Sequence, residues 1–201
     1  MVHTLDPQVL QRALAGDQEA FTVVVDTYQT PVYNLCARML GDGIEAEDAA
    51  QETFWRAYQA LHRYDRQRPF ATWLLSIAAH YCIDRLRRRR LSFISMDQGE
   101  DGETIELQDA GAPNPEAEVV RHEQREQMQG FLQKLNSVDR AAIILRYWHD
   151  CSETEIAAAL HLTVSAVKSR LHRARRELGS LWKEEEIHSN HERRPHESPA
   201  F

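Results

Sequence analysis

Residues 152–178 read SETEIAAALHLTVSAVKSRLHRARREL, and this stretch decides the fold class. Ser152 and Glu155, three residues apart, form a capping box, which predicts the start of a short helix. The turn 161–163 follows, and the apolar residues of 164–178 recur at helical spacing. This arrangement predicts a helix-turn-helix with a basic second helix, the layout that enters a DNA major groove. The alternative is an ordinary solvated basic helix, but the agreement of cap, turn and charge favours the groove-reading helix.

The two faces of this second helix carry different residue types. Val167, Leu171 and Ala174 lie at three- and four-residue steps, so they predict the face that packs on a core. The other face is polar and basic, and such side chains can contact base edges or phosphates. The candidates for base edges are Lys168, Ser169, His172 and Arg173. The candidates for phosphates are Arg170, Arg175 and Arg176.

Outside this stretch, every periodic segment also predicts a helix, and no internal repeat or alternating strand pattern is present. Pro31 interrupts the first periodic segment and predicts a kink or the start of a new helix. The sequence Gly41-Asp42-Gly43 is a turn signal. The predicted fold is all-α, with two small helical domains joined by a flexible acidic linker. The predicted helices cover 17–40, 42–61, 70–91, 116–135, 138–147, 153–160 and 164–182.

Charge is segregated along the chain, so the net charge of -7 over 201 residues hides two basic blocks. Residues 63–95 hold 8 basic and 2 acidic residues, and residues 140–183 hold 8 and 4. Between them, residues 96–120 hold 8 acidic residues and no basic one, with the Gly and Pro residues typical of a flexible linker. Two basic blocks around an acidic spacer predict two nucleic-acid contacts on one chain. The predicted division is a first domain over 6–94, the linker over 95–116, a second domain over 117–183 and a disordered polar tail over 184–201.

Several classes of protein are disfavoured. The longest uncharged apolar stretch, 70–81, is too short to cross a membrane, and no signal peptide is visible, so a cytoplasmic location is expected. The three cysteines form no CxxC pair, so neither a disulfide framework nor a cysteine zinc site is predicted. No spaced acid–base or metal constellation and no Gly-rich phosphate loop is present, which argues against an enzyme and against a cofactor. The histidines of the tail lack the surrounding shell that a metal site needs.

Three motifs together resemble the sigma factors of bacterial RNA polymerase. SETEIA over 152–157, followed by AVKSRLHRAR over 166–175, resembles region 4 of the extracytoplasmic-function (ECF) group. EDAAQETFWRAY over 47–58 resembles the region 2 helix that binds core polymerase. FATWLLSIA over 70–78, continuing to IDRLRRR over 83–89, resembles the helix that reads and melts the -10 promoter element.

The resemblance covers about residues 6–182, and it implies that 6–94 is sigma region 2 and 117–183 is region 4. Two departures concern the helix-turn-helix. His161 stands where the family often has Gly in a left-handed turn, and Ser165-Ala166 replaces the usual Gly-Thr. These departures are compatible with the fold, but they leave the -35 sequence undetermined.

One face of the predicted helix 42–61 mixes acids, an amide and an aromatic residue at three- and four-residue spacing, which suits a polar partner helix. The resemblance implies that this partner is the coiled-coil clamp of the largest polymerase subunit, with a further contact at the flap region. The alternative is a solvated surface face. The candidates for core binding are Asp48, Gln51, Glu52, Trp55 and Arg56.

Capture of the -10 element as a single strand needs a stacking surface for bases and cations for phosphates. The loop 64–70 can supply both, and the resemblance implies base-reading groups near His80. Trp73 lies on the apolar spacing of its helix, which favours a place in the core over stacking on bases. The -10 candidates are Tyr64, Arg66, Arg68, His80, Asp84, Arg87 and Arg88.

The resemblance implies two partners besides the polymerase, namely promoter DNA and an anti-sigma factor, which is often membrane-anchored. The acidic linker suits a positively charged polymerase channel, and the alternative is a mere tether. A helix-turn-helix regulator that does not bind core polymerase is the alternative function. The absence of an alternating strand–helix pattern argues against the receiver domain of such a regulator.

Overall fold

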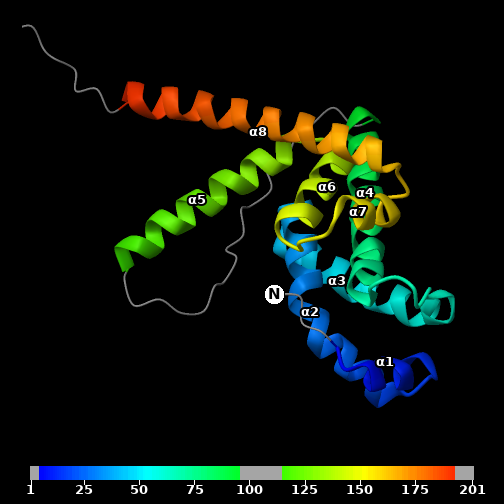
Figure 1. The fold of residues 1–201 in the computed structure, drawn as a ribbon. Coiled ribbons are helices and arrows are strands. Elements are labelled where there is room, and N and C mark those ends of the chain that lie inside the picture. Colours follow the sequence, from blue (N-terminus) through cyan, green and yellow to red (C-terminus); the bar gives the residue numbers. More distant parts are fainter. Residues whose placement is uncertain (1–4, 96–114, 193–201) are drawn as a thin grey trace, which may run out of the picture.

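The computed structural model describes residues 5–95 and 115–192, and within these residues all regular structure is helical (Figure 1). The predicted all-α fold is thus confirmed. Residues 96–114, which make up most of the predicted linker, lie outside the described residues. The elements in chain order are α1 (Pro7–Leu14), α2 (Gln18–Leu40), α3 (Gly43–Ala60), the 3-10 turn η1 (Leu61–Arg63), α4 (Phe70–Ser95), α5 (Pro115–Lys134), α6 (Ser137–Tyr147), α7 (Glu153–Ala159) and α8 (Val164–Glu192).

Short polar side chains cap the starts of α2 and α3, and a glycine ends α2. The carboxylate of Asp17 accepts a hydrogen bond from the backbone N–H of Ala20 (3.1 Å), and that of Asp42 accepts one from Glu45 (2.8 Å). Each carboxylate satisfies an N–H group that has no partner within its own helix. Gly41 ends α2 with a φ of 76°, a left-handed conformation that favours glycine. The turn predicted from the GDG sequence is therefore a C-cap followed directly by an N-cap.

Three features differ from the sequence-based predictions. Helix α1 was not predicted, although Asp6 caps it and Pro7 occupies its first position. Pro31 lies inside α2, which continues to Leu40, so the proline does not start a new helix. Helix α8 continues to Glu192, beyond the end predicted for it at residue 182. Residues 193–201 lie outside the described residues.

The chain forms two helical halves, each built on a buried apolar face. In the first half, α2 packs on α3 and α4, and Val32, Leu35 and Leu74 are almost fully buried. In the second half, α8 packs on α6 and α7 around residues such as Ile144 and Ile156. Removal of these side chains from water is the main stabilising contribution to each half.

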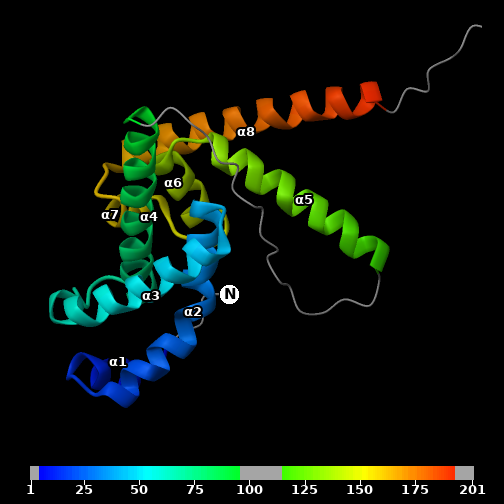
Figure 2. The ribbon, with the colours of Figure 1, turned by 180° about the vertical axis from the view of Figure 1, so that it is seen from behind.

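The two halves also contact each other directly. Helix α6 packs against α2 and α4, and α7 packs against α4, so the buried apolar residues form one continuous cluster. Figure 2 shows α4 beside α6 and α7, whereas α5 and the end of α8 extend away from this core. No sequence pattern indicated this contact between the halves.

Candidate nucleic-acid and polymerase interfaces

The helix-turn-helix predicted from the sequence is present as α7, a tight turn and α8. The capping box is complete: Glu155 N–H donates to the Ser152 hydroxyl (3.2 Å), and Ser152 N–H donates to the Glu155 carboxylate (2.7 Å). His161 has a φ of 53°, so it adopts the left-handed conformation for which the family often uses glycine. Thr163 then caps α8 by accepting from Ala166 N–H (3.1 Å).

Helix α8 divides into a buried face and an exposed face. Val167, Leu171 and Ala174 are buried, as their spacing predicted. Among the base-edge candidates, Lys168, Ser169, His172 and Arg173 are all exposed. Among the phosphate candidates, Arg175 and Arg176 are exposed and Arg170 is half-buried. The fold therefore presents a basic strip on α8, and the role of each residue stays a prediction.

Two arginines of α8 share one buried carboxylate, which the sequence analysis missed. Asp139 of α6 is 0% exposed; its Oδ1 accepts from Arg170 (2.7 Å), and its Oδ2 accepts from Nε (3.0 Å) and Nη2 (2.6 Å) of Arg173. Asn136 donates a further hydrogen bond to Oδ2 (2.7 Å). Burial alone would raise the pKa of Asp139, but the bonds from Arg170, Arg173 and Asn136 outweigh it, and the pKa falls below its ordinary value.

The predicted polymerase-binding residues lie together on one face of α3. Trp55 is 57% exposed, which is unusual for so large an apolar side chain. Arg56 pairs with Glu52 (2.7 Å) and lies over the ring of Tyr81 in α4 (4.7 Å to the centroid). Asp48 and Gln51 are also exposed, whereas Ala49 and Phe54 on the other face are buried.

The aromatic -10 candidate belongs to a cluster at the start of α4. The ring of Tyr64 packs on Phe70 (5.3 Å between centroids) and on Trp73 (5.2 Å), and its hydroxyl donates to the carbonyl of Arg68 (2.5 Å). Tyr64 and Trp73 are both partly buried and pack against the core. Arg66 and Arg68 are exposed beside the cluster. The cluster thus combines aromatic surface with cations.

The remaining -10 candidates lie along α4. Asp84, Arg87 and Arg88 are exposed, and Asp84 approaches Arg87 at 3.9 Å. His80 is half-buried, and its ring centroid lies 4.9 Å from that of His161 in the helix-turn-helix. The two predicted DNA-binding surfaces therefore touch each other in this arrangement.

Polar side chains of the second half cap the C-terminus of α2. The carbonyl groups of residues 37–39 receive hydrogen bonds from Gln129, Gln133 and Arg140. Arg140 is buried and also donates to the carbonyls of Gln133 (2.7 Å) and Leu135 (3.2 Å). Burial lowers the pKa of Arg140 to about 10, so its side chain is still a cation at neutral pH. These bonds add polar partners at the end of α2, where the carbonyl of Ala37 also accepts from the backbone N–H of Gly41 (2.9 Å).

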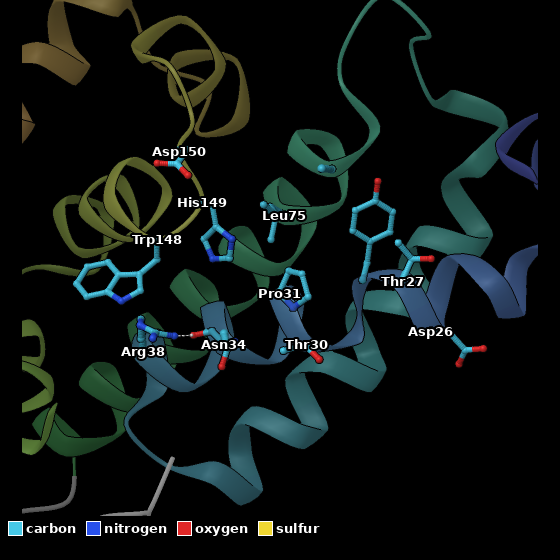
Figure 3. Close-up of a pocket in the computed structure, with 12 residues that line it drawn as sticks. Asp26, Thr27, Thr30, Pro31, Asn34, Arg38, Leu75, Trp148, His149 and Asp150 are labelled. Atoms are coloured by element: carbon cyan, nitrogen blue, oxygen red, sulfur yellow. Dashed lines mark hydrogen bonds between the residues drawn. The ribbon is translucent and has the colours of Figure 1, made fainter. Parts of the chain in front are cut away.

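A cavity of about 460 Å³ lies at the same junction between the halves (Figure 3). Its lining comes from α2, from α4 and from residues 148–150, which follow α6. The guanidinium of Arg38 lies 5.1 Å from the ring centroid of Trp148. His149 is 9% exposed, and its Nε2 has no hydrogen-bond partner among the described residues. Burial and the nearby charge of Arg38 lower the pKa of His149 to about 4.

In the described part of the chain, no group of three or more His, Cys, Asp or Glu residues is arranged to hold a metal ion. None of the described helices is long and apolar enough to cross a membrane. The fold and its surfaces define a class: a helical protein with a basic helix-turn-helix in one half and an exposed polar–aromatic helix face in the other.

Comparison with known proteins identifies the family. A model of sigma-70 region 2 matches residues 24–91, and a model of sigma-70 region 4 matches residues 125–178. The chain is 39% identical over 172 residues to the ECF RNA polymerase sigma factor SigW of Bacillus subtilis, covering 84% of this chain and 92% of that protein. It is 34% identical over 184 residues to the ECF RNA polymerase sigma-E factor of Escherichia coli, covering 87% and 93%.

Two solved structures share the fold. CnrH, solved in complex with the cytosolic domain of CnrY, is 27% identical with a TM-score of 0.63, over 87% of this chain and 95% of CnrH. The sigma factor RpoE, solved with the anti-sigma factor NepR from Bartonella quintana, is 21% identical with a TM-score of 0.65, over 81% and 96%. At that identity, the second comparison shows the fold alone. The chain belongs to the sigma-70 family, in the group of ECF RNA polymerase sigma factors, and the resemblance read from its motifs is confirmed.

Proposed function

We propose that this sigma factor binds core RNA polymerase through the exposed face of α3 and reads promoter DNA with α4 and α8. The carrying observation is that one chain presents both the exposed Trp55 face and the basic strip of α8. The family match does not favour the alternative of a regulator that acts without core polymerase. We also propose that the protein works in the cytoplasm and has no catalytic activity of its own.

The α3 face is proposed as the docking surface for the clamp of the largest polymerase subunit. An exposed tryptophan surrounded by polar groups is typical of the centre of a protein–protein interface. We expect Asp48→Ala combined with Gln51→Ala to weaken binding to core polymerase, with helix content unchanged by circular dichroism. The matched control is Gln18→Ala with Glu19→Ala, which alters one exposed amide and one exposed acid on α2. Unchanged affinity in the first variant would remove the α3 face from the interface.

The aromatic cluster before and within α4 is proposed to hold the melted -10 strand. Stacking on Tyr64 would use its accessible part, and Arg66 and Arg68 would neutralise phosphates. We expect Tyr64→Ala holoenzyme to bind duplex promoter but to leave thymines near -10 less reactive to permanganate. Normal permanganate reactivity would rule out a role for Tyr64 in melting. Arg66→Ala is the companion variant, because its exposed side chain can be removed without a cavity.

Promoter binding requires the two halves to separate. The -35 and -10 elements lie about 25 base pairs apart, roughly 85 Å at about 3.4 Å per base pair. In the structure, however, His80 of the -10 surface and His161 of the helix-turn-helix are in ring contact. We propose that the bonds to the C-terminus of α2 break when the protein binds polymerase and DNA. Energy transfer between dyes on α3 and α8 should fall on holoenzyme formation, and constant transfer would contradict the separation.

Regulation by an anti-sigma factor is proposed from the relatives. CnrH was solved bound to the cytosolic domain of another protein, and this chain shares its fold at 27% identity. A partner that holds the two halves together would keep the -10 and -35 surfaces in contact with each other.

The acidic segment 96–120 is proposed to follow a positively charged polymerase channel, because it contains 8 acidic residues and no basic residue.

A further inference from the structure

A fully buried carboxylate lies directly beneath the basic helix α8. Asp139 sits in the first turn of α6, and both of its oxygens are occupied by hydrogen bonds from α8 and from Asn136. A buried charge is retained only when charged or hydrogen-bonding partners compensate it. Here the compensation comes from two arginines of α8, Arg170 and Arg173, so Asp139 lies directly beneath the basic strip that is proposed to face DNA.

The geometry of the Arg173 contact restricts what this side chain can still do. A guanidinium has five N–H donors, and it contacts a carboxylate or a guanine through two adjacent donors on one edge. The Nε and Nη2 atoms of Arg173 already face Oδ2 of Asp139, at 3.0 and 2.6 Å. The terminal edge, which carries Nη1 and the second hydrogen of Nη2, is left for DNA. The side chain is 58% exposed, so that edge reaches solvent.

Arg170 is held by the same carboxylate but lies deeper. Its Nη1 donates to Oδ1 of Asp139 at 2.7 Å, and its side chain is 30% exposed. Lys168 shows a different arrangement, because its Nζ lies 3.7 Å from Glu153 and both side chains are largely solvated. A solvated surface ion pair restricts the conformation of its side chains only weakly. A buried carboxylate that accepts short hydrogen bonds holds the side chains of its partners in one conformation.

We propose that Asp139 is a positioning residue for promoter recognition: it fixes the guanidinium of Arg173 so that only the terminal edge faces the bases of the -35 element. This inference rests on the proposed function, since it assumes that α8 reads that element. A free arginine side chain must be ordered when it binds, and a side chain already held in place loses less freedom. Because Asp139 occupies the Nε edge of the Arg173 guanidinium, this edge cannot contact a base. Arg173 can then contact bases only through its terminal edge, which reduces the number of bases that it can recognise.

The test measures holoenzyme affinity for a panel of promoters with each -35 base pair replaced in turn, at two salt concentrations. Wild-type protein, Asp139→Asn, Arg173→Ala and the double variant are compared. Both single variants should lose discrimination at the same base pair, roughly tenfold, the scale of one bidentate contact. The double variant should be no worse than Arg173→Ala alone, because the two residues act as one unit.

Two further variants guard the interpretation. Glu153→Gln removes the surface partner of Lys168 and should leave the discrimination profile unchanged. Arg173→Lys keeps the charge on an exposed side chain, but an ammonium group cannot contact Asp139 through one edge and a base through the other. This variant should therefore lose discrimination between -35 bases, while the salt dependence of binding stays the same. This variant tests the geometry even if Asp139→Asn fails to fold, which thermal unfolding would reveal.

The possible outcomes separate the inference from the function on which it rests. If the wild-type holoenzyme shows no preference at any -35 position, the proposed function of α8 fails. If the wild type discriminates and Asp139→Asn discriminates equally well, only the positioning role is overturned. Equal changes for all promoters in Asp139→Asn would also overturn it, because Asp139 would then act through net charge alone. If Arg173→Lys still discriminates between -35 bases, the proposed contact of one guanidinium edge with Asp139 and the other with a base is contradicted.

Discussion

One contribution to destabilisation by acid should come from a buried histidine, His149, at the junction between the two halves. The residue is 9% exposed, its Nε2 has no partner among the described residues, and Arg38 of α2 adds an unfavourable positive charge. Burial and Arg38 together lower the pKa to about 4, although Asp150 acts in the opposite direction. The unfolded chain would accept a proton on this residue near pH 6.5.

The sign and size of the effect follow from these two values. Between pH 6.5 and pH 4, the unfolded chain binds a proton at His149 that the folded chain does not bind, so the free energy of unfolding falls as the pH falls. From pH 7.5 to pH 5, the contribution of this one group is a loss of about 2 kcal/mol. Well above pH 6.5 the histidine is neutral in both states, and its contribution no longer varies.

The assay is urea unfolding at pH 7.5, 6 and 5, followed by circular dichroism, for the wild type and for His149→Gln. Glutamine does not titrate, so the variant should lose about 2 kcal/mol less than the wild type over this range. If wild type and His149→Gln lose equal stability between pH 7.5 and pH 5, the reasoning about this buried imidazole is refuted.

Two further predictions concern backbone conformation and capping. Gly41→Ala should cost about 1–2 kcal/mol in unfolding free energy, because its φ is 76°; the Gln133 amide, 2.8 Å from the new Cβ, is the end of a flexible side chain that can shift. Gly16→Ala, at a φ of 92° with no atom within 4 Å of the new Cβ, should have a similar cost for the same backbone reason, and no loss of stability in either variant would contradict that reason. Ser152→Ala should cost about 1 kcal/mol through loss of the capping box of α7, as measured by urea unfolding. An unchanged unfolding midpoint in Ser152→Ala would show that the capping box does not stabilise the fold.

Local signals in the sequence were sufficient to predict most helices. The capping box of α7 and the buried spacing of Val167 and Leu171 depend on neighbouring residues alone, and the structure confirms them. Helix α1 was not predicted, because eight residues are too few to show a helical period of apolar residues, even with Asp6 and Pro7 at its start. The C-terminal end of α8 was not predicted, because a helix that extends away from the core needs no apolar face. Its polar composition resembles that of a disordered tail.

Contacts between distant elements were beyond the reach of sequence reasoning. Asp139 read as an ordinary acidic residue in the first turn of a helix, and only the packing of α8 on α6 places two arginines against it. The capping of α2 by Arg140 depends in the same way on how the two halves meet. The candidate residues of α3 and α8 share faces as their spacing predicted, but the contacts that hold Arg173 and His80 could not be derived from spacing.

The most direct test of the central claim is run-off transcription with purified core RNA polymerase, with and without this protein, on a library of promoter templates. The proposed function predicts transcripts of defined length that start only when the protein is present, from templates that share a -35 and a -10 element. Asp48→Ala combined with Gln51→Ala should abolish these transcripts at protein concentrations where the wild type is active. The absence of any transcript beyond that of core polymerase alone, with a protein that is folded by circular dichroism, would contradict the assignment of this chain as a promoter-selecting sigma factor.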